Sequence, residues 1–144
     1  MKVVLDANIY VSSMVNNQGN PKRIMAMWEQ GDFDVLVSKS IIDEVGRVLR
    51  YPRIVKRHKQ DEAAIERFLE LLAREAVIVE PAEVLDVVQK DESDNRYLEC
   101  ALEGKAQYVV SGDQHLLKVG EHKDIIILPP AAFVALLERG ELYG

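Results

Sequence analysis

The stretch that decides the fold is residues 90–117, which read KDESDNRYLECALEGKAQYVVSGDQHLL. Asp91 and Asp94 stand where a helix begins, and apolar residues then recur at helical spacing. Gly104 is expected to end this helix in a left-handed conformation. Residues 107–110 are a short β-branched and aromatic run that predicts a strand, with Ser-Gly-Asp directly after it. The stretch therefore places one carboxylate at a helix start and another beyond a strand end, where open α/β sheets bind ligands.

The rest of the chain alternates buried strands with amphipathic helices in the same way. Predicted strands lie at residues 3–5, 33–37, 77–79, 107–110 and 125–128. Predicted helices lie at residues 20–31 with Asn20 as N-cap, 40–51 with Ser40 as N-cap, 61–76, 91–104, and 130–137 closed by Gly140. Residues 9–17 are ambiguous, with a short helix as one interpretation, and residues 83–89 are not assigned. Because nearly every strand is apolar throughout, this order predicts a parallel sheet covered by helices on both faces.

Length and composition restrict the class of protein. The 144 residues are expected to form one domain, residues 1–144, and 48% hydrophobic with 29% charged residues is ordinary for a soluble globular protein. No apolar run approaches the roughly 20 residues that span a membrane. The start MKVVL enters a strand directly and leaves no room for a signal peptide, and Cys100 has no second cysteine, so the cytoplasm is the expected compartment. The formal charge of −6 disfavours a broad basic surface but is compatible with a local basic segment.

Four carboxylates stand near strand ends or on helices that follow strands: Asp6, Glu44, Asp94 and Asp113. Each alone has an ordinary explanation as a turn residue, a helix cap or one half of a surface salt bridge. If the first and fourth strands are neighbours, Asp6 and Asp113 meet at one sheet edge, where they would repel by about 4 kcal/mol at an effective dielectric near 20. A hard cation relieves such repulsion, and oxygen ligands favour Mg²⁺ or Mn²⁺ over Zn²⁺. A cation held this way lowers the pKa of a bound water and clamps a phosphodiester.

The chain resembles a PIN-domain ribonuclease of the kind found as the toxin in bacterial and archaeal toxin–antitoxin pairs. The matching segments occur in the family's order and span nearly the whole chain: VVLDANIYVSS, SKSIIDEVGRVL, DESDNRYLECALEGKAQYVVSGDQHLL and IIILPPAAFVALL. The resemblance implies an α/β fold with three α/β/α layers and a five-stranded parallel sheet in the order 3-2-1-4-5. That order places the first and fourth strands side by side.

The same resemblance implies the roles of the site residues. Asp6, Asp94 and Asp113 would hold Mg²⁺ or Mn²⁺ directly or through water, and Glu44 would complete the cluster. Asn8 and Ser111 would act as polar supports, with Ser111 hydrogen-bonded to the Asp6 carboxylate, and Asp91 matches an extra acid of one branch of the family. The implied activity is metal-dependent hydrolysis of RNA phosphodiester bonds, with a small antitoxin protein as partner. A homodimer stays open, because the sequence does not separate a core face from an interface face.

A basic segment follows Glu44, since no acid occurs before Asp61. Its candidate substrate-binding residues are Arg47, Arg50, Arg53 and Lys56. They form either a stripe that tracks RNA phosphates or a solvated helix face. His58 and His122 are interpreted as surface residues, and Tyr97 as a packing residue.

Two other functions stay open. A haloacid-dehalogenase-like phosphatase also begins with a strand and an aspartate, but it needs a second aspartate where Asn8 stands. A PIN-like RNA-binding or scaffold domain that has lost its metal is the non-enzymatic alternative. The presence of all four carboxylates argues against it, and metal titration distinguishes the two.

Overall fold

The computed structural model describes residues 1–88 and 92–143, and the side chains of residues 1–88 and 94–140. The strands are β1 (Lys2–Leu5), β2 (Asp34–Val37), β3 (Val77–Ile78), β4 (Tyr108–Val110), β5 (Glu121–His122) and β6 (Ile125–Leu128). The helices are α1 (Ala7–Val15), α2 (Asn20–Glu29), α3 (Lys39–Leu49), α4 (Pro52–His58), α5 (Glu62–Glu75), α6 (Glu92–Gly104), α7 (Gln114–Val119) and α8 (Pro130–Tyr143).

The strands form one sheet in the order β3-β2-β1-β4-β6-β5. All neighbours pair in parallel except β5 and β6. The predicted order 3-2-1-4 and the parallel pairing are confirmed, and the predicted fifth strand is β6. The prediction of five strands was wrong, because β5 is two polar residues long and joins β6 through Lys123 and Asp124. Both have positive φ, 47° and 69°, as a tight two-residue hairpin requires, but they lack the Asn-Gly signature that reveals such a turn in a sequence.

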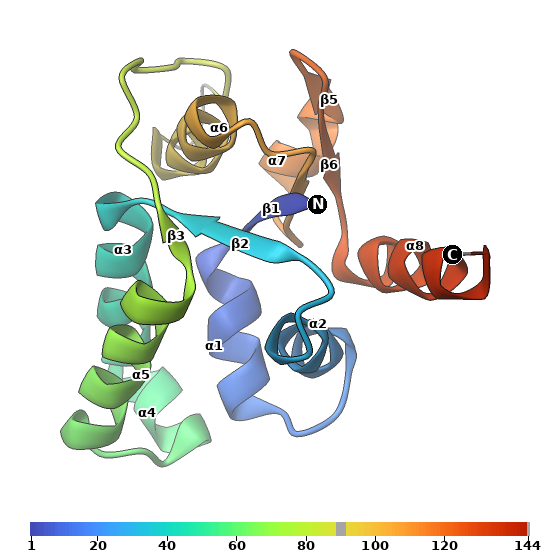
Figure 1. Ribbon diagram of the computed structural model, residues 1–144. Helices are drawn as coiled ribbons and strands as arrows, with labels where there is room; N and C mark the ends of the chain where they lie inside the picture. The colour runs from blue at the N-terminus through green and yellow to red at the C-terminus, as the bar shows by residue number, and fades with distance from the viewer. Residues whose placement is uncertain (89–91, 144) are drawn as a thin grey trace.

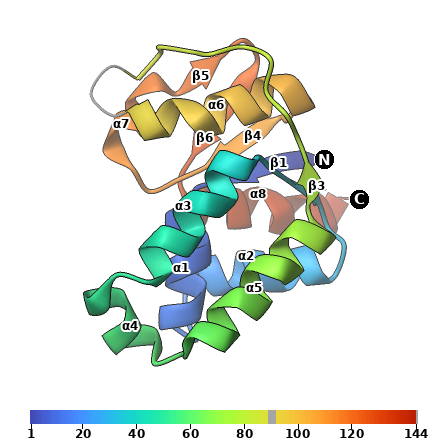
Figure 2. The same ribbon diagram turned by 90° about the vertical axis from the view of Figure 1, so that its left-hand side faces the viewer.

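The helices lie on both sides of the sheet (Figure 1). In Figures 1 and 2, α6 lies over one face and α1, α2 and α8 lie on the opposite side, with α3, α4 and α5 gathered beside α1. Among the described residues, none of the helices has both the length and the apolar character needed to cross a membrane. The layered α/β/α arrangement agrees with the predicted fold class.

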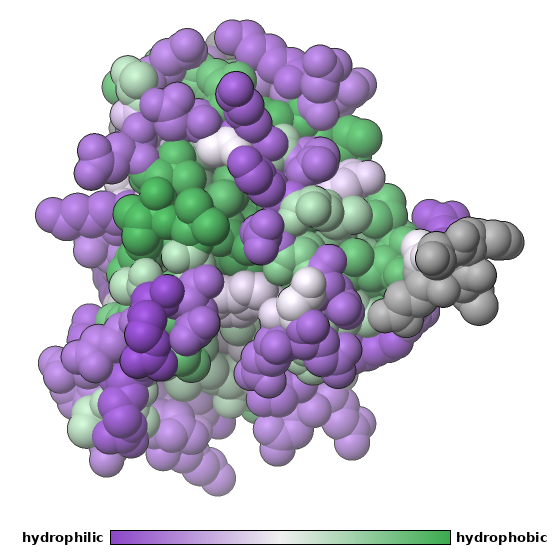
Figure 3. Space-filling view, in the orientation of Figure 1, coloured by the Kyte–Doolittle hydropathy of each residue, from purple (hydrophilic) through white to green (hydrophobic). Residues whose placement is uncertain are grey.

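The edge strand β3 leaves apolar surface uncovered. Val77 and Ile78 are about half exposed, and Figure 3 shows an apolar area at this position on the sheet edge. The interior strands differ sharply, since β1, β2 and β4 are buried at nearly every position. The core is therefore centred on β1, at the middle of the sheet, and it is at the carboxyl end of this strand that the candidate site begins.

Several helix boundaries differ from the predictions. The N-cap of α3 is Ser38, whose hydroxyl accepts the Ile41 N–H at 3.3 Å, and Ser40 lies inside the helix. The ambiguous residues 9–17 belong largely to α1, while α4 and α7 were not predicted. Helix α8 continues past Gly140 to Tyr143. Short helices of six or seven residues carry too few apolar repeats to be recognised by periodicity.

Gly104 ends α6 for a different reason from the predicted one. It is the last helical residue, and the following Lys105 takes the left-handed conformation with φ 57°. A Cβ on Gly104 would lie 2.3 Å from Leu36 Cδ1, so the residue has no room for a side chain against β2. The glycine is therefore explained by close packing of helix on sheet.

Side chains of α6 hold the irregular segment that precedes it. Asn95 Oδ1 accepts the N–H groups of Val87 and Val88 at 2.9 and 2.7 Å, and its Nδ2 donates to Val88 O at 2.8 Å. One turn later, Glu99 Oε2 accepts the Leu85 N–H at 2.8 Å. Residues 83–88 form neither helix nor strand, so these side chains take the place of a sheet partner. Gln89, at the end of the unassigned stretch, lies outside the described residues.

Candidate active site

The carboxyl ends of β1 and β4 meet as the predicted strand order requires. Leu5 pairs with Val110, and the Asp6 N–H donates to Val110 O at 3.0 Å. Ser111 Oγ donates to Asp6 Oδ2 at 2.5 Å and accepts the Asp113 N–H at 2.9 Å. The hydrogen bond that the family resemblance implied between Ser111 and Asp6 is thus present, and Ser111 joins the two strand ends.

Asp6 is a buried carboxylate, with 3% of its surface exposed. Burial raises the pKa of this carboxyl above its usual value of 3.8, hydrogen bonds from Ser111 and the Asn8 N–H oppose the rise, and the negative charge of Asp113 adds to it. Both residues contact Ser111 Oγ, Asp6 through its carboxylate and Asp113 through its backbone N–H, so they lie close together. A cation bound beside Asp6 and Asp113 would favour the ionised form of both carboxylates and offset their repulsion.

Asp113 also caps a helix. Its Oδ1 accepts the N–H groups of His115 and Leu116 at 2.8 and 3.2 Å, at the start of α7. Apart from the metal-ligand role, the local sequence predicted a Ser-Gly-Asp turn and not α7, because a cap of a six-residue helix and an Asp turn share the same local signature. Its half-buried position leaves the residue open to solvent on one side, unlike Asp6.

Glu44 reaches the same region through Tyr97. The Tyr97 hydroxyl donates to Glu44 Oε2 at 2.5 Å and accepts the Ala7 N–H at 3.1 Å, so α3, α6 and the start of α1 meet at one oxygen. The same hydroxyl lies beside Asp6. Sequence reasoning assigned Tyr97 to packing and missed this contact. The available signal was a tyrosine on an otherwise apolar helix face, because a buried phenol needs a hydrogen-bond partner.

Asp94 is buried, with 5% of its surface exposed, and precedes Tyr97 by three residues on α6. Residues three apart on a helix share a face, so Asp94 lies on the face of α6 that carries Tyr97. Asp91 lies outside the described residues. Asn8 is exposed, and the contact it makes with Asp6 is through its backbone N–H at 3.0 Å. The predicted role of its side chain as a support stays a prediction.

The basic segment is divided between α3 and α4. Arg50 is bound to Glu62 of α5, with Nε 2.8 and 3.1 Å from the two carboxylate oxygens. Arg47 NH2 lies 3.9 Å from Glu44 Oε1, whereas Arg53 and Lys56 are exposed on α4. The four residues therefore do not form one continuous stripe.

His58 was interpreted as a surface residue, and that prediction was wrong. It is buried, with Nε2 2.8 Å from Leu49 O and Nδ1 accepting the Gln60 N–H at 2.9 Å. These partners require the neutral tautomer that carries its proton on Nε2. The residue closes the junction between α3 and α4, which the sequence could not show because α4 itself was not recognised.

The donor chemistry of the site suits a hard divalent cation. Among the residues whose side chains are described, no group of three His, Cys, Asp or Glu is arranged to hold a metal ion. Mg²⁺ does not need such a cage, since it is commonly bound through one or two carboxylates, with water and substrate phosphates as its other ligands. The adjacent oxygen donors Asp6 and Asp113 fit that mode of binding.

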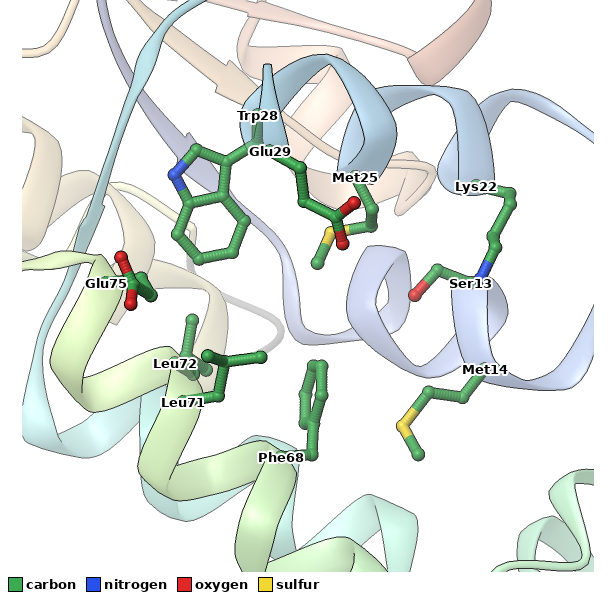
Figure 4. Close-up of a pocket in the computed structure, with 10 residues that line it drawn as sticks. All are labelled: Ser13, Met14, Lys22, Met25, Trp28, Glu29, Phe68, Leu71, Leu72 and Glu75. Carbon is green, nitrogen blue, oxygen red and sulfur yellow. The ribbon is translucent and has the colours of Figure 1, made fainter. Parts of the chain in front are cut away.

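A pocket of about 560 Å³ lies away from these carboxylates, among α1, α2 and α5. Figure 4 shows side chains of the three helices turned toward a common space, with Trp28 and Phe68 on different sides of it. Its lining is largely apolar, with charged groups as well: Ser13, Met14, Lys22, Met25, Trp28, Glu29, Phe68, Leu71, Leu72 and Glu75. The strand-end site and this pocket are therefore separate features.

Comparison with known proteins finds a relative and a family match. A curated protein of Methanocaldococcus jannaschii, described as uncharacterized, is 29% identical over 119 residues, which cover 83% of this chain and 75% of the relative. Residues 2–115 match the PIN domain family, and this match includes β1, β4 and all four candidate carboxylates. PIN domains are generally metal-dependent nucleases that act on RNA. The chain belongs to the PIN-domain family.

Proposed function

We propose that this chain, acting as one domain over residues 1–144, is an endoribonuclease dependent on Mg²⁺ or Mn²⁺. The candidate site is defined by Asp6, Glu44, Asp94 and Asp113. The observation that carries the proposal is the buried Asp6 carboxyl, hydrogen-bonded by Ser111 and close to the charge of Asp113. Unfavourable charge proximity of this kind is typical of functional sites.

Each residue has a distinct role in the proposal. Asp6 and Asp113 would hold the cation directly and Asp94 through water, and the bound cation would supply a positive charge against the phosphate and a more acidic water. Ser111 fixes the orientation of Asp6 through a 2.5 Å hydrogen bond. Glu44, whose Oε2 accepts the Tyr97 hydroxyl, completes the metal site through water or orients the attacking water. Arg53 and Lys56, exposed on α4, contact RNA phosphates.

The test is cleavage of a structured, fluorescently labelled RNA with Mg²⁺ or Mn²⁺. Asp6→Asn and Asp94→Asn are each expected to lower the rate by more than about a hundredfold, because loss of a positioned charge commonly has that effect. Asp43→Asn, an exposed acid on α3, is the matched control and should cleave normally. Circular dichroism must show that all three variants are folded. Activity within tenfold of wild type for a folded Asp6→Asn or Asp94→Asn protein would refute the site assignment.

The proposal extends to the toxin half of a toxin–antitoxin pair. Its support is the family and the separate apolar pocket, which an apolar side chain of a small partner protein would fill. A neighbouring small reading frame should encode a protein that binds this chain and suppresses cleavage. Leu71→Asp, in the pocket, should weaken that complex, and Val84→Asp, exposed outside it, should not. The alternative partner is a second copy of this chain, and a molar mass of twice the monomer for the purified chain alone would identify it.

A further inference from the structure

The Tyr97 hydroxyl, carried by α6, contacts two other elements that form the candidate site, α3 and the start of α1. It donates to Glu44 Oε2 at 2.5 Å and accepts the Ala7 N–H at 3.1 Å. The Tyr97 ring is 1% exposed, so water does not compete for these contacts. The oxygen therefore links α6 both to α3 and to the first peptide of α1.

The directions of these hydrogen bonds follow from the groups involved. A phenol carries one proton, and the carboxylates of Glu44 and Asp6 beside it only accept, so the proton is donated in the 2.5 Å contact to Glu44 Oε2. The Ala7 N–H only donates, so the phenol oxygen must accept it. Ala7 N–H belongs to the first turn of α1, where backbone donors lack partners within the helix. Asp6 accepts the next one, from Asn8. Tyr97 and Asp6 thus cap α1 together.

The electrostatic surroundings keep this hydroxyl in its donor form. Burial raises the pKa of Tyr97 above its ordinary value, and the negative charges of Asp6 and Glu44 raise it further. The opposite oxygen of Glu44, Oε1, lies 3.9 Å from Arg47 NH2. Tyr97 and Arg47 are therefore two of the groups that restrict the rotamers of the Glu44 side chain.

We propose that Tyr97 is a positioning residue, which holds the Glu44 carboxylate in its working orientation toward the end of β1 by a buried hydrogen bond anchored on Ala7. This inference rests on the proposed function for its catalytic consequence, but the contact is defined by geometry alone. Phenylalanine preserves the ring and removes the hydroxyl. Tyr97→Phe therefore removes the hydroxyl contact to Glu44 Oε2 while keeping the packing of the ring.

A matched control exists on α1. Tyr10 is also fully buried, and its hydroxyl finds no hydrogen-bond partner among the described residues. Tyr10→Phe makes the same chemical change at a hydroxyl that makes no hydrogen bond to Glu44. Tyr97→Phe is expected to lower kcat by about tenfold or more with KM changed less than twofold, because misplacement of a catalytic group acts on the chemical step. Tyr10→Phe should change neither parameter.

Testing Tyr97→Phe in a Glu44→Ala protein shows whether Tyr97 acts by positioning Glu44 or only by supporting the fold. In a Glu44→Ala protein there is no carboxylate to hold, so adding Tyr97→Phe should leave the residual rate within twofold. If Tyr97→Phe lowers the rate by the same factor with and without Glu44, or raises KM alone, the proposal is overturned.

An independent readout tests the contact without any assay of cleavage. Amide hydrogen exchange at Ala7, followed by NMR, should be at least tenfold faster in Tyr97→Phe than in wild type and unchanged in Tyr10→Phe. An unchanged Ala7 exchange rate overturns the proposal whatever the kinetics show. If wild type cleaves no RNA, the proposed function fails, while Ala7 exchange and the coupling of Tyr97 to Glu44 in unfolding experiments still decide whether the tyrosine holds the carboxylate.

Discussion

The fold brings the candidate carboxylates together from distant parts of the sequence, whereas it separates basic residues that are close in the sequence. The four candidate carboxylates are scattered from residue 6 to residue 113, yet the pairing of β1 with β4 and the Tyr97 hydroxyl draw at least Asp6, Asp113 and Glu44 into one region. The basic segment is compact in sequence but is divided among α3, α4 and an ion pair to α5. Topology, not proximity in sequence, decides which charges can act together.

The largest effect that we expect is stabilisation of the folded protein by a cation bound to the carboxylates. Mn²⁺ at a hundredfold excess over its Kd should stabilise the folded protein by about 2.7 kcal/mol at pH 8, and by less at pH 5 because metals bind deprotonated ligands. Asp6→Asn and Asp113→Asn should each remove most of the gain, whereas Asp43→Asn should keep it. Thermal melting at both pH values and matched ionic strength measures it. Equal metal shifts at the two pH values would show that these acids do not share a cation.

The second effect concerns the divided basic segment. Replacing Arg53 and Lys56 by Gln should reduce the slope of log K for RNA binding against log salt by about one for each lost phosphate contact. Arg50→Gln is the matched control, because its guanidinium is bound by Glu62 and is not presented to RNA. Binding titrations at several salt concentrations give the slopes. If Arg50→Gln reduces the salt slope as much as the Arg53 and Lys56 replacements do, the four basic residues act as one continuous RNA-binding stripe.

The smallest effect is a pH dependence specific to Asp6. Its folded pKa is raised above 3.8, so the folded state holds the proton more tightly than the unfolded state does. The resulting stability is fully present below the unfolded pKa and is lost as pH rises through the raised value. Asn cannot ionise, so Asp6→Asn should become more stable relative to wild type between pH 3.5 and pH 7 without metal. Urea unfolding in EDTA measures this difference, with Asp43→Asn as the control. A difference that is constant across this range contradicts the inference.

Much of the fold was predictable, because a strand that is buried on both faces of the sheet is apolar at nearly every position. Continuous apolar runs identified β1, β2, β4 and β6, and the predicted position of the last agrees with the structure at both ends. The missed elements are short: β5 has two residues, α7 has six and α4 has seven. Elements of that length are stabilised by tertiary contacts, for which the local sequence carries little signal.

For the candidate site, the positions of residues at strand ends were predictable, but side-chain contacts between distant helices were not. Carboxylates at strand ends could be assigned to one edge as soon as the strand order was known, and Ser111 bonds Asp6 as the family resemblance implied. The Tyr97–Glu44 contact could not be predicted, because it joins residues 53 positions apart through the rotamers of two side chains. The burial of His58 was hidden for the same reason, since its partner Leu49 lies on a different helix.

The attachment of residues 85–88 to α6 has a consequence for how proteases should cut this protein. A stretch without helix or strand is ordinarily the first place to be cleaved, because the chain must extend locally to enter a protease. Here Asn95 and Glu99 fix its carboxyl-terminal half, while Val84 is 83% exposed and has no such attachment. Limited digestion should therefore cut near Val84 and spare Val87 and Val88. Asn95→Ala should extend the cleavage into them, so the nicking pattern would report directly on whether α6 is in place.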